Sequence, residues 1–265
     1  MLPGTVRGGG GDRSVAYSRR VDFSGKSIPD TGFPDDDGSA HPALERALAA
    51  PEVDDEAVSR ALCEARLLVP VVAILTEEED VAPGELRREK SSDMAVPTIQ
   101  GPDGRRALPA FTSVAALARW RADARPIPVE AARAAHAAYA EEADTLLLDL
   151  AGPYPHEVSG SRLRAVAEGR AHLAPHRDPE VLGAVREAVH SESAVSAVYL
   201  TEGGGNDLTL SLVAAASPVE VTEAARRIVG RLAEDDVVRA RLDRGLDLAM
   251  LPPGASLEAE PLFSR

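Results

Sequence analysis

The sequence has little of several residue types, and each shortage excludes a class of protein. Cys63 is the single cysteine, so the chain cannot form an intrachain disulfide, which favours a reducing compartment. No apolar run reaches the roughly 20 residues of a membrane span, and the opening residues lack the apolar core of a signal peptide. Aromatic residues make up 3% of the chain, so aliphatic side chains and alanine must fill the core. We therefore expect a cytoplasmic protein.

Positive charge is also scarce. The 265 residues include 43 acidic and 29 basic side chains, which gives a net charge of −14. A diffuse negative field repels phosphate backbones and anionic lipids, so the sequence predicts neither nucleic acid nor membrane as a partner. The chain is long enough for two small domains, each with its own core.

Composition and apolar periodicity divide the chain into four parts. Residues 1–40 combine a glycine run with scattered charge and almost no apolar pattern, which predicts a disordered tail. A first folded unit is expected at 41–170. Polar residues and prolines at 171–177 are typical of a linker, and a second unit is expected at 178–265.

In the first unit, order is expected to begin at "HPALERALAA", and Asp54 and Asp55 lead a predicted helix in "EAVSRALCEARLL". The apolar run "RLLVPVVAIL" is typical of a strand buried on both faces, except that Pro70 has no N–H to donate and needs a bulge or an unpaired edge. "DMAVPTIQ" and "RRALPAF" flank the turn signal "GPDG" and predict a hairpin. Thr112 or Ser113 is expected to cap the following helix.

In the second unit, Asp178 and Pro179 start a predicted helix, and "GGGND" separates two alternating segments that predict a further hairpin. A second amphipathic helix and a last strand in "GLDLAMLPPG" follow. Hairpins thus alternate with helix crossovers along the chain. The predicted fold class is α/β with mixed α+β character: two small units, each a mixed sheet covered by helices.

Three possible motifs give way to simpler interpretations. "GGGND" is followed by a strand and lacks the Lys of a phosphate loop, so it is a turn. His172 and His176 are four apart, but Pro175 lies between them and no Glu completes a zinc pattern. Cys63 has no nearby histidine or second cysteine in the sequence. The sequence therefore predicts no metal, no cofactor and no reactive thiol.

The stretch "EKSSDMAVPTI" is the strongest candidate for a site. Lys90 beside Ser91 and Ser92 supplies the residue types of a Ser/Lys nucleophile, but no glycine elbow or oxyanion donor accompanies them. Binding is the favoured alternative, through polar groups near the start of a helix that could meet a partner's carboxylate or a small anion. The predicted binding residues are Lys90, Ser92, Asp93, Thr112 and Ser113, with none predicted to be catalytic.

Several whole segments carry a family resemblance: "GKSIPDTGFPDDDGSAHPAL", "ARLLVPVVAIL", "LRREKSSDMAVPTI", "LPAFTSVAALARW" and "ADTLLLDLAGPYPHEVSG". Together they resemble the SseB family (enhanced serine sensitivity type), in its actinobacterial form with an SseB amino-terminal domain. The likeness covers residues from about 26 to 170, and the segment from Asp178 to Leu212 resembles that form's carboxy-terminal part. The resemblance implies no catalytic residues.

Two functions remain open at this point. The favoured one is a non-enzymatic cytoplasmic interaction or regulatory module that offers a groove or a sheet edge to a protein partner. The alternative, suggested by the family name alone, is a small-molecule binding protein or enzyme related to amino-acid or sulfur metabolism. A ligand pocket should be concave with convergent polar groups, whereas an interaction module should show an open patch. The sequence leaves the oligomeric state open.

Overall fold

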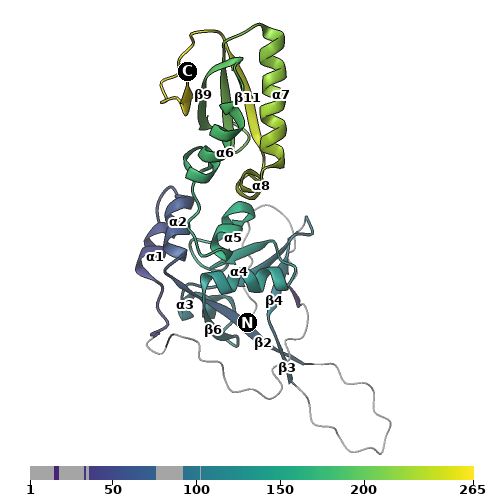
Figure 1. Ribbon diagram of the computed structural model, residues 1–265. Helices are drawn as coiled ribbons and strands as arrows, with labels where there is room; N and C mark the ends of the chain where they lie inside the picture. The colour runs from purple at the N-terminus through teal and green to yellow at the C-terminus, as the bar shows by residue number, and fades with distance from the viewer. Residues whose placement is uncertain (1–14, 18–32, 34–35, 76–91, 102) are drawn as a thin grey trace, which may run out of the picture. The chain divides into compact units, whose positions relative to one another are not determined.

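The structure is a computed structural model that describes residues 15–17, 33, 36–75, 92–101 and 103–265 (Figure 1). The chain divides into two compact units, unit 1 (Met1–Ala171) and unit 2 (His172–Arg265). The division falls at the start of the segment interpreted above as a linker. The described residues form eight α-helices and mixed sheets, which confirms the predicted mixed α/β class.

Unit 1 contains two sheets rather than one. Its helices are α1 (Pro42–Leu48), α2 (Asp55–Leu62), α3 (Val114–Trp120), α4 (Ala131–Ala140) and α5 (Gly160–Ala167). Its strands are β1 (Val15–Tyr17), β2 (Arg66–Leu75), β3 (Ser92–Ala95), β4 (Pro97–Gln100), β5 (Arg106–Ala110), β6 (Arg125–Glu130), β7 (Thr145–Leu148) and β8 (His156–Ser159). A five-stranded sheet has the order β1-β4-β5-β7-β8, with β5 and β7 parallel. A three-stranded antiparallel sheet has the order β3-β2-β6.

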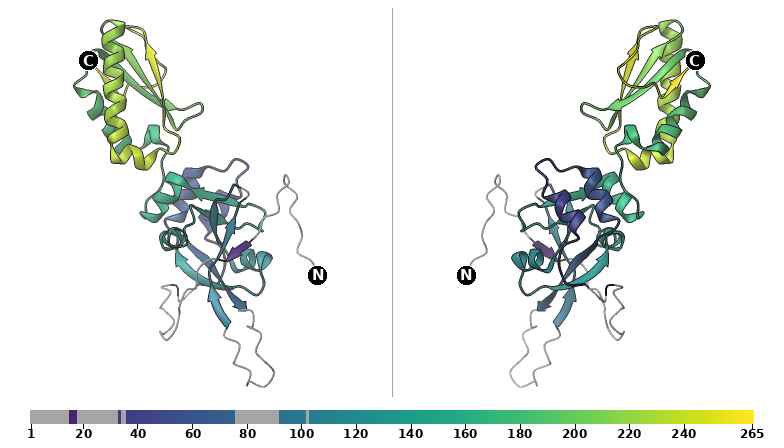
Figure 2. Two further views of the ribbon diagram at one scale, coloured as in Figure 1. Left: turned by 90° about the vertical axis from the view of Figure 1, so that its right-hand side faces the viewer. Right: turned by 90° about the vertical axis from the view of Figure 1, so that its left-hand side faces the viewer.

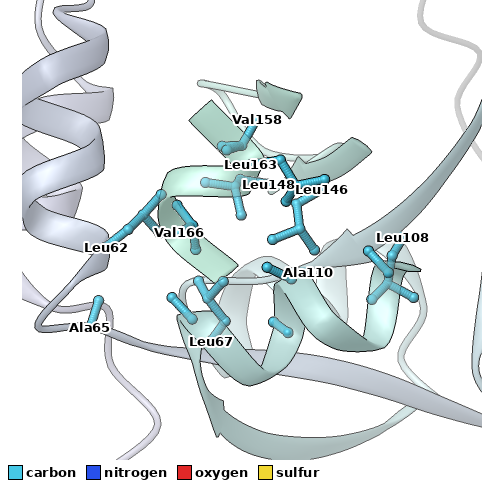
Figure 3. Packing of buried hydrophobic residues seen from close by; sticks show 14 of the residues in the cluster. Leu62, Ala65, Leu67, Leu108, Ala110, Leu146, Leu148, Val158, Leu163 and Val166 are labelled. Carbon is cyan, nitrogen blue, oxygen red and sulfur yellow. The ribbon is translucent and has the colours of Figure 1, made fainter. Parts of the chain in front are cut away.

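The core of unit 1 joins this sheet pair to the four helices α1, α2, α4 and α5 (Figure 3). Leu108 on β5 lies in register with Leu146 on β7, and both are fully buried. Leu62 from α2 and Leu163 from α5 contribute to the same cluster, while α4 adds alanines on its inner face. The small alanine side chains let α4 pack close to the other elements of this core, which suits a chain with few aromatic side chains.

Pro70 lies where β2 changes partners. Leu68 and Phe111 exchange backbone hydrogen bonds at 2.8 and 2.9 Å on one side of β2, and pairing on that side resumes at Val72 with Ala95 of β3. Backbone groups alternate sides along a strand, so the nitrogen of Pro70 faces the interval between these two partners. This interval is the unpaired position that the sequence required.

The predicted hairpin is confirmed for its second half only. Ile99 and Gln100 of β4 pair with β5 across the turn, where Gly101 N–H donates to Arg105 at 2.8 Å and Gly104 has φ +82°. The segment "DMA" instead forms β3, which pairs with β2 in the other sheet. Pro97 begins β4, so one apolar run supplies two strands of different sheets.

Part of the predicted tail belongs to the folded unit. The carboxylate of Asp36 accepts hydrogen bonds from Nε and Nη2 of Arg66, at 2.7 and 2.8 Å. Arg66 also donates to the carbonyl oxygen of Ser39, and β1 pairs with β4. The buried Arg66 thus takes acceptors from Asp36 and Ser39 at the end of the predicted tail, and disorder over the rest of residues 1–40 stays a prediction.

Unit 2 has one four-stranded sheet with helices packed on it (Figure 2). Its elements are the short 3-10 helix η1 (Pro175–Arg177), α6 (Pro179–His190), β9 (Val195–Glu202), β10 (Leu208–Ala214), α7 (Pro218–Glu234), α8 (Asp236–Arg241), β11 (Leu246–Leu251) and β12 (Phe263–Ser264). The strand order is β11-β10-β9-β12; β10 and β11 are parallel, and the other pairs are antiparallel.

The helices of unit 2 begin where the sequence provides caps. The side chain of Asp178 accepts the N–H of Glu180 at α6, and Ser217 with Glu220 forms a capping box at α7. Valines of α6 and apolar residues of α7 pack on Leu210 and Leu212 of β10. Among the described residues, no helix is long and apolar enough to cross a membrane.

Candidate functional site

Thr112 and Ser113, two of the predicted binding residues, serve the fold of unit 1. Thr112 is buried; its hydroxyl donates to Oδ2 of Asp149 at 2.6 Å and its N–H donates to Oδ1 at 2.9 Å. The Thr112 carbonyl oxygen accepts from Arg66. Asp149 has a φ of +46°, so this pair of hydrogen bonds fixes a left-handed residue at the end of β7.

Ser113 caps α3, as predicted, by accepting the N–H of Ala116 at 3.1 Å. The N–H of Val114 donates to Gly38, and that of Leu117 donates to the Ser113 carbonyl. These donors were expected to meet a partner's carboxylate or a small anion. They are occupied within the protein instead, and a binding role for Thr112 and Ser113 stays a prediction.

The remaining predicted residues lie elsewhere. Lys90 is outside the described residues, and Ser92 and Asp93 are on β3, where they pair with Leu75 and Ile74 of β2. Thr112 follows Phe111, which bridges to Leu68 near the other end of β2. Ile74 is six positions beyond Leu68 on the strand, or about 20 Å away. The structure does not bring Ser92 and Asp93 to Thr112, and a binding role for Lys90, Ser92 and Asp93 stays a prediction.

A cavity of about 350 Å³ is one concave candidate among the described residues of unit 1. It lies at the C-terminal ends of α2 and α5 and the N-terminal end of α4, and its lining includes Leu62, Cys63, Glu64, Ala65, Glu130, Ala131 and Val166. Phe33 also lines it, and its sequence neighbours are outside the described residues. Burial raises the pKa of the Cys63 thiol, with a contribution from Glu64. The cavity therefore lacks an activated nucleophile at Cys63.

A polar cluster in unit 1 joins α2, β8 and α5. Asp55 receives a hydrogen bond from Arg162 and lies 3.5 Å from Nε2 of His156. Burial lowers the pKa of His156 more strongly than the nearby Asp55 raises it. The arrangement ties three elements together. Among the described residues, no group of three or more His, Cys, Asp or Glu could hold a metal ion.

The open candidate is the outer edge of β11 in unit 2. This unit is described throughout, and β11 is an end strand with β10 as its neighbour. Leu248 and Met250 are 41% and 46% exposed, whereas their register partners Leu210 and Leu212 are fully buried. Register partners in a parallel pair share a face of the sheet, so the exposed pair extends the apolar face of the core to its margin.

The turn "GGGND" positions β11. Oδ2 of Asp207 accepts the N–H groups of Asp243 and Gly245, at 2.8 and 3.0 Å. Nδ2 of Asn206 donates to Oδ1 of Asp247 at 2.7 Å. The hairpin turn between β9 and β10 thereby holds the first residues of β11 in register with β10.

Hydrogen bonds on the far side of the sheet show which backbone groups of β9 face β10. The N–H groups of Leu262 and Arg265 donate to the carbonyl oxygens of Val198 and Ser196, at 2.8 and 2.9 Å. Even-numbered residues of β9 therefore face β12. Because backbone groups alternate along a strand, odd-numbered residues of β9 bond to β10.

The same alternation carries across β10 to the free edge. The odd-numbered residues of β10 lie opposite the odd-numbered residues of β9, so even-numbered residues of β10 face β11. In a parallel pair, each bonding residue of one strand bonds to the two residues that flank its register partner on the other strand. The register partners of the even-numbered residues of β10 are even-numbered in β11, so the residues of β11 that bond to β10 are odd-numbered. Leu246, Leu248 and Met250 are left with N–H and C=O groups that point away from the sheet.

The two edges of this sheet differ in how they are protected. β12 has two residues, and the guanidinium of the adjacent Arg265 lies 5.2 Å from the Phe263 ring centroid. A short strand with an adjacent charge discourages pairing with another strand. β11 has six residues without proline, lysine or glycine, and no bulge is seen in its register with β10. The sequence predicted this strand but gave it no role; its alternating apolar residues ahead of Pro252 were the available signal.

Comparison with known proteins identifies part of the chain. Residues 43–165 match the family described as SseB protein N-terminal domain. No curated protein and no solved structure matches the chain. The match covers α1 to most of α5 in unit 1, and β11 lies outside it. The predicted resemblance to the SseB family is thus supported by a match at residues 43–165 to the SseB protein N-terminal domain.

Proposed function

We propose that this chain is a non-enzymatic protein-interaction module of the SseB family, which binds by adding a strand to the outer edge of β11. One observation carries the proposal: the end strand presents the outward backbone groups of three residues together with the exposed side chains of Leu248 and Met250. Backbone hydrogen bonds of an added strand would supply affinity, and these side chains would supply apolar contact. The proposed location is the cytoplasm.

Site-specific photo-cross-linking in the native host tests this function. A photoreactive amino acid is placed at Leu248 on the edge, and at Val219 as a control. Val219 is 69% exposed at the start of α7, so it reports contacts made by any open apolar surface of unit 2. Protein adducts should form from position 248 and not from position 219. Absence of adducts at 248, or equal adducts at both positions, would refute strand addition at this edge.

The alternative is a small-molecule binding protein or enzyme related to amino-acid or sulfur metabolism. The cavity beside Cys63 favours it, since about 350 Å³ lies at the lower end of ordinary ligand pockets. Thermal-shift measurements of the full chain against amino acids test it. A ligand-dependent rise in melting temperature that disappears in Ala131→Trp, a substitution that fills the cavity wall, would favour the alternative; no rise would leave it without support.

A further inference from the structure

We infer that the strand added to β11 is β11 of a second copy of the chain, paired antiparallel about a two-fold axis at Leu248. This inference rests on the proposed function, since it names the partner of the same edge. It follows from the order of side chains and backbone groups along β11.

The strand is self-complementary in its hydrogen bonding. The outward N–H and C=O groups belong to Leu246, Leu248 and Met250, at intervals of two residues. In an antiparallel pair, two residues that lie opposite each other and point their backbone groups toward the other strand exchange two hydrogen bonds. An axis at Leu248 places Leu248 opposite its own copy and Leu246 opposite Met250. All three outward residues of each copy are then used.

An axis at Ala249 satisfies fewer groups. Leu248 would lie opposite Met250, but Leu246 would lie opposite Pro252, which has no N–H to donate. The axis at Leu248 is therefore preferred over an axis at Ala249. The proline pair after β11 ends the usable edge and selects the register.

The side chains agree with the same axis. Leu246, Leu248 and Met250 share the face of the sheet that carries the core, so their pairing would join the exposed margins of two apolar cores. Asp247 lies opposite Ala249, so no like charges face each other within the paired strands. An interface in which the same residues appear on both sides is the type that two-fold symmetry produces.

Net charge opposes the association at long range. Each copy carries a net charge of −14, and dissolved salt screens repulsion between exposed charges. The dimer fraction should therefore rise between 50 mM and 500 mM NaCl. Association through surface ion pairs would respond in the opposite direction.

A disulfide test reports the register directly. In the full chain carrying Cys63→Ser, Leu248→Cys places two cysteines opposite each other, with Cα atoms about 5.5 Å apart in a hydrogen-bonded pair. This separation lies within the disulfide range. Met250→Cys in the same background is the matched control, because it is similarly exposed but lies opposite Leu246. Mild oxidation should yield a covalent dimer with Leu248→Cys at several times the yield with Met250→Cys.

Sedimentation of the full chain supplies the second measurement. The unmodified chain should show a salt-enhanced dimer, and Leu248→Lys, which sets two charges face to face, should be monomeric. Val219→Lys should remain dimeric, and unchanged melting temperatures should show that both variants are folded. A monomeric unmodified chain at both salt concentrations, or equal cross-linking of the two cysteine variants, would overturn the inference. Photo-adducts between position 248 and a different protein would overturn the inference that the partner is a second copy of the chain, while supporting the proposed function. Absence of any adduct would refute both the inference and the proposed function.

Discussion

Arg66 and Asp36 are 30 positions apart in the sequence, yet the guanidinium of Arg66 donates to both carboxylate oxygens of Asp36. The side chain of Arg66 is 8% exposed and that of Asp36 is 16% exposed, so water cannot readily replace either partner. These two hydrogen bonds lower the pKa of Asp36. The segment before α1 is thereby fixed to the first residue of β2.

Asp36→Ala should destabilise unit 1 by about 2 kcal/mol, the scale for hydrogen bonds to a charged group, because Arg66 loses its carboxylate partner. Denaturant unfolding of the full chain measures the loss. Asp37→Ala is the control, since Asp37 is exposed and bonds to Ser39 alone among the described contacts. Equal stability of the two variants would show that the Arg66 pair contributes nothing.

Pro70→Val should destabilise the chain by about 1 to 3 kcal/mol, although valine is the better strand former. The new N–H would face the interval between Phe111 and β3, inside a buried strand. Pro126→Val is the control: Pro126 is the exposed register partner of Pro70, and its nitrogen points away from β2. Thermal unfolding should give a lower melting temperature for Pro70→Val than for Pro126→Val. An unchanged melting temperature in Pro70→Val would mean that β2 has no gap in its strand pairing at Pro70.

Low pH should remove the contribution of Glu192 to the stability of unit 2. Hydrogen bonds from Arg227 are the main cause that lowers its pKa from 4.5, and Arg231 adds to the effect. A lowered folded pKa stabilises the fold at pH above 4.5, and this stability is lost as pH falls through the lower folded value. The melting-temperature gap between the natural chain and Glu192→Gln should therefore be wide at pH 7 and narrow at pH 3. Exposed Glu187→Gln should show no gap at either pH.

The Cys63 thiol should react slowly with iodoacetamide at pH 7.5. Cys63 is exposed as a residue, but partial burial of its thiol raises the pKa, and Sγ donates to the carbonyl oxygen of Ser59 at 3.4 Å; both effects disfavour the thiolate. The rate constant should be well below that of free glutathione under the same conditions. A faster reaction would point to an activating group near the cavity.

Asp207→Ala should loosen β11 without unfolding unit 2. The substitution removes the carboxylate that accepts from Asp243 and Gly245 ahead of the strand. Hydrogen exchange should therefore accelerate at the amides of Asp247, Ala249 and Leu251, which face β10, more than at those of β9. Ala substitution of exposed Asp236 on α8 supplies the comparison, and equal protection of β11 in both variants would contradict the anchoring role.

Local patterns predicted much of the fold. Ser113 capped α3 and the glycine turn joined β9 to β10, because both depend on residues close in sequence. Asp36 was assigned to a tail, since its partner Arg66 is distant and periodicity carries no information on such pairs. Met94 and Val96 were placed in one arm of a hairpin, although the chain changes sheets there. A strand's partner depends on tertiary packing that alternation alone does not specify.

The candidate site was harder to predict for the same reason. Thr112 and Ser113 have the residue types of a binding loop, but their bonding capacity is used by Asp149 and Ala116. Leu248 has no polar chemistry to attract notice. Its significance comes from its position at the end of a sheet, which requires the strand order, and that order is set by a crossover connection.

The parallel pairing of β10 with β11 also fixes an order of events during synthesis. β9 and β10 are adjacent in the sequence and can form their hairpin as soon as both have left the ribosome. β11 reaches β10 only after α7 and α8 have been made, which at about 5 to 20 residues per second takes seconds. During that interval β10 is the end strand, and its apolar residues include Leu208, Leu210 and Leu212. A nascent chain is therefore most open to misassembly at β10, before the edge of β11 exists.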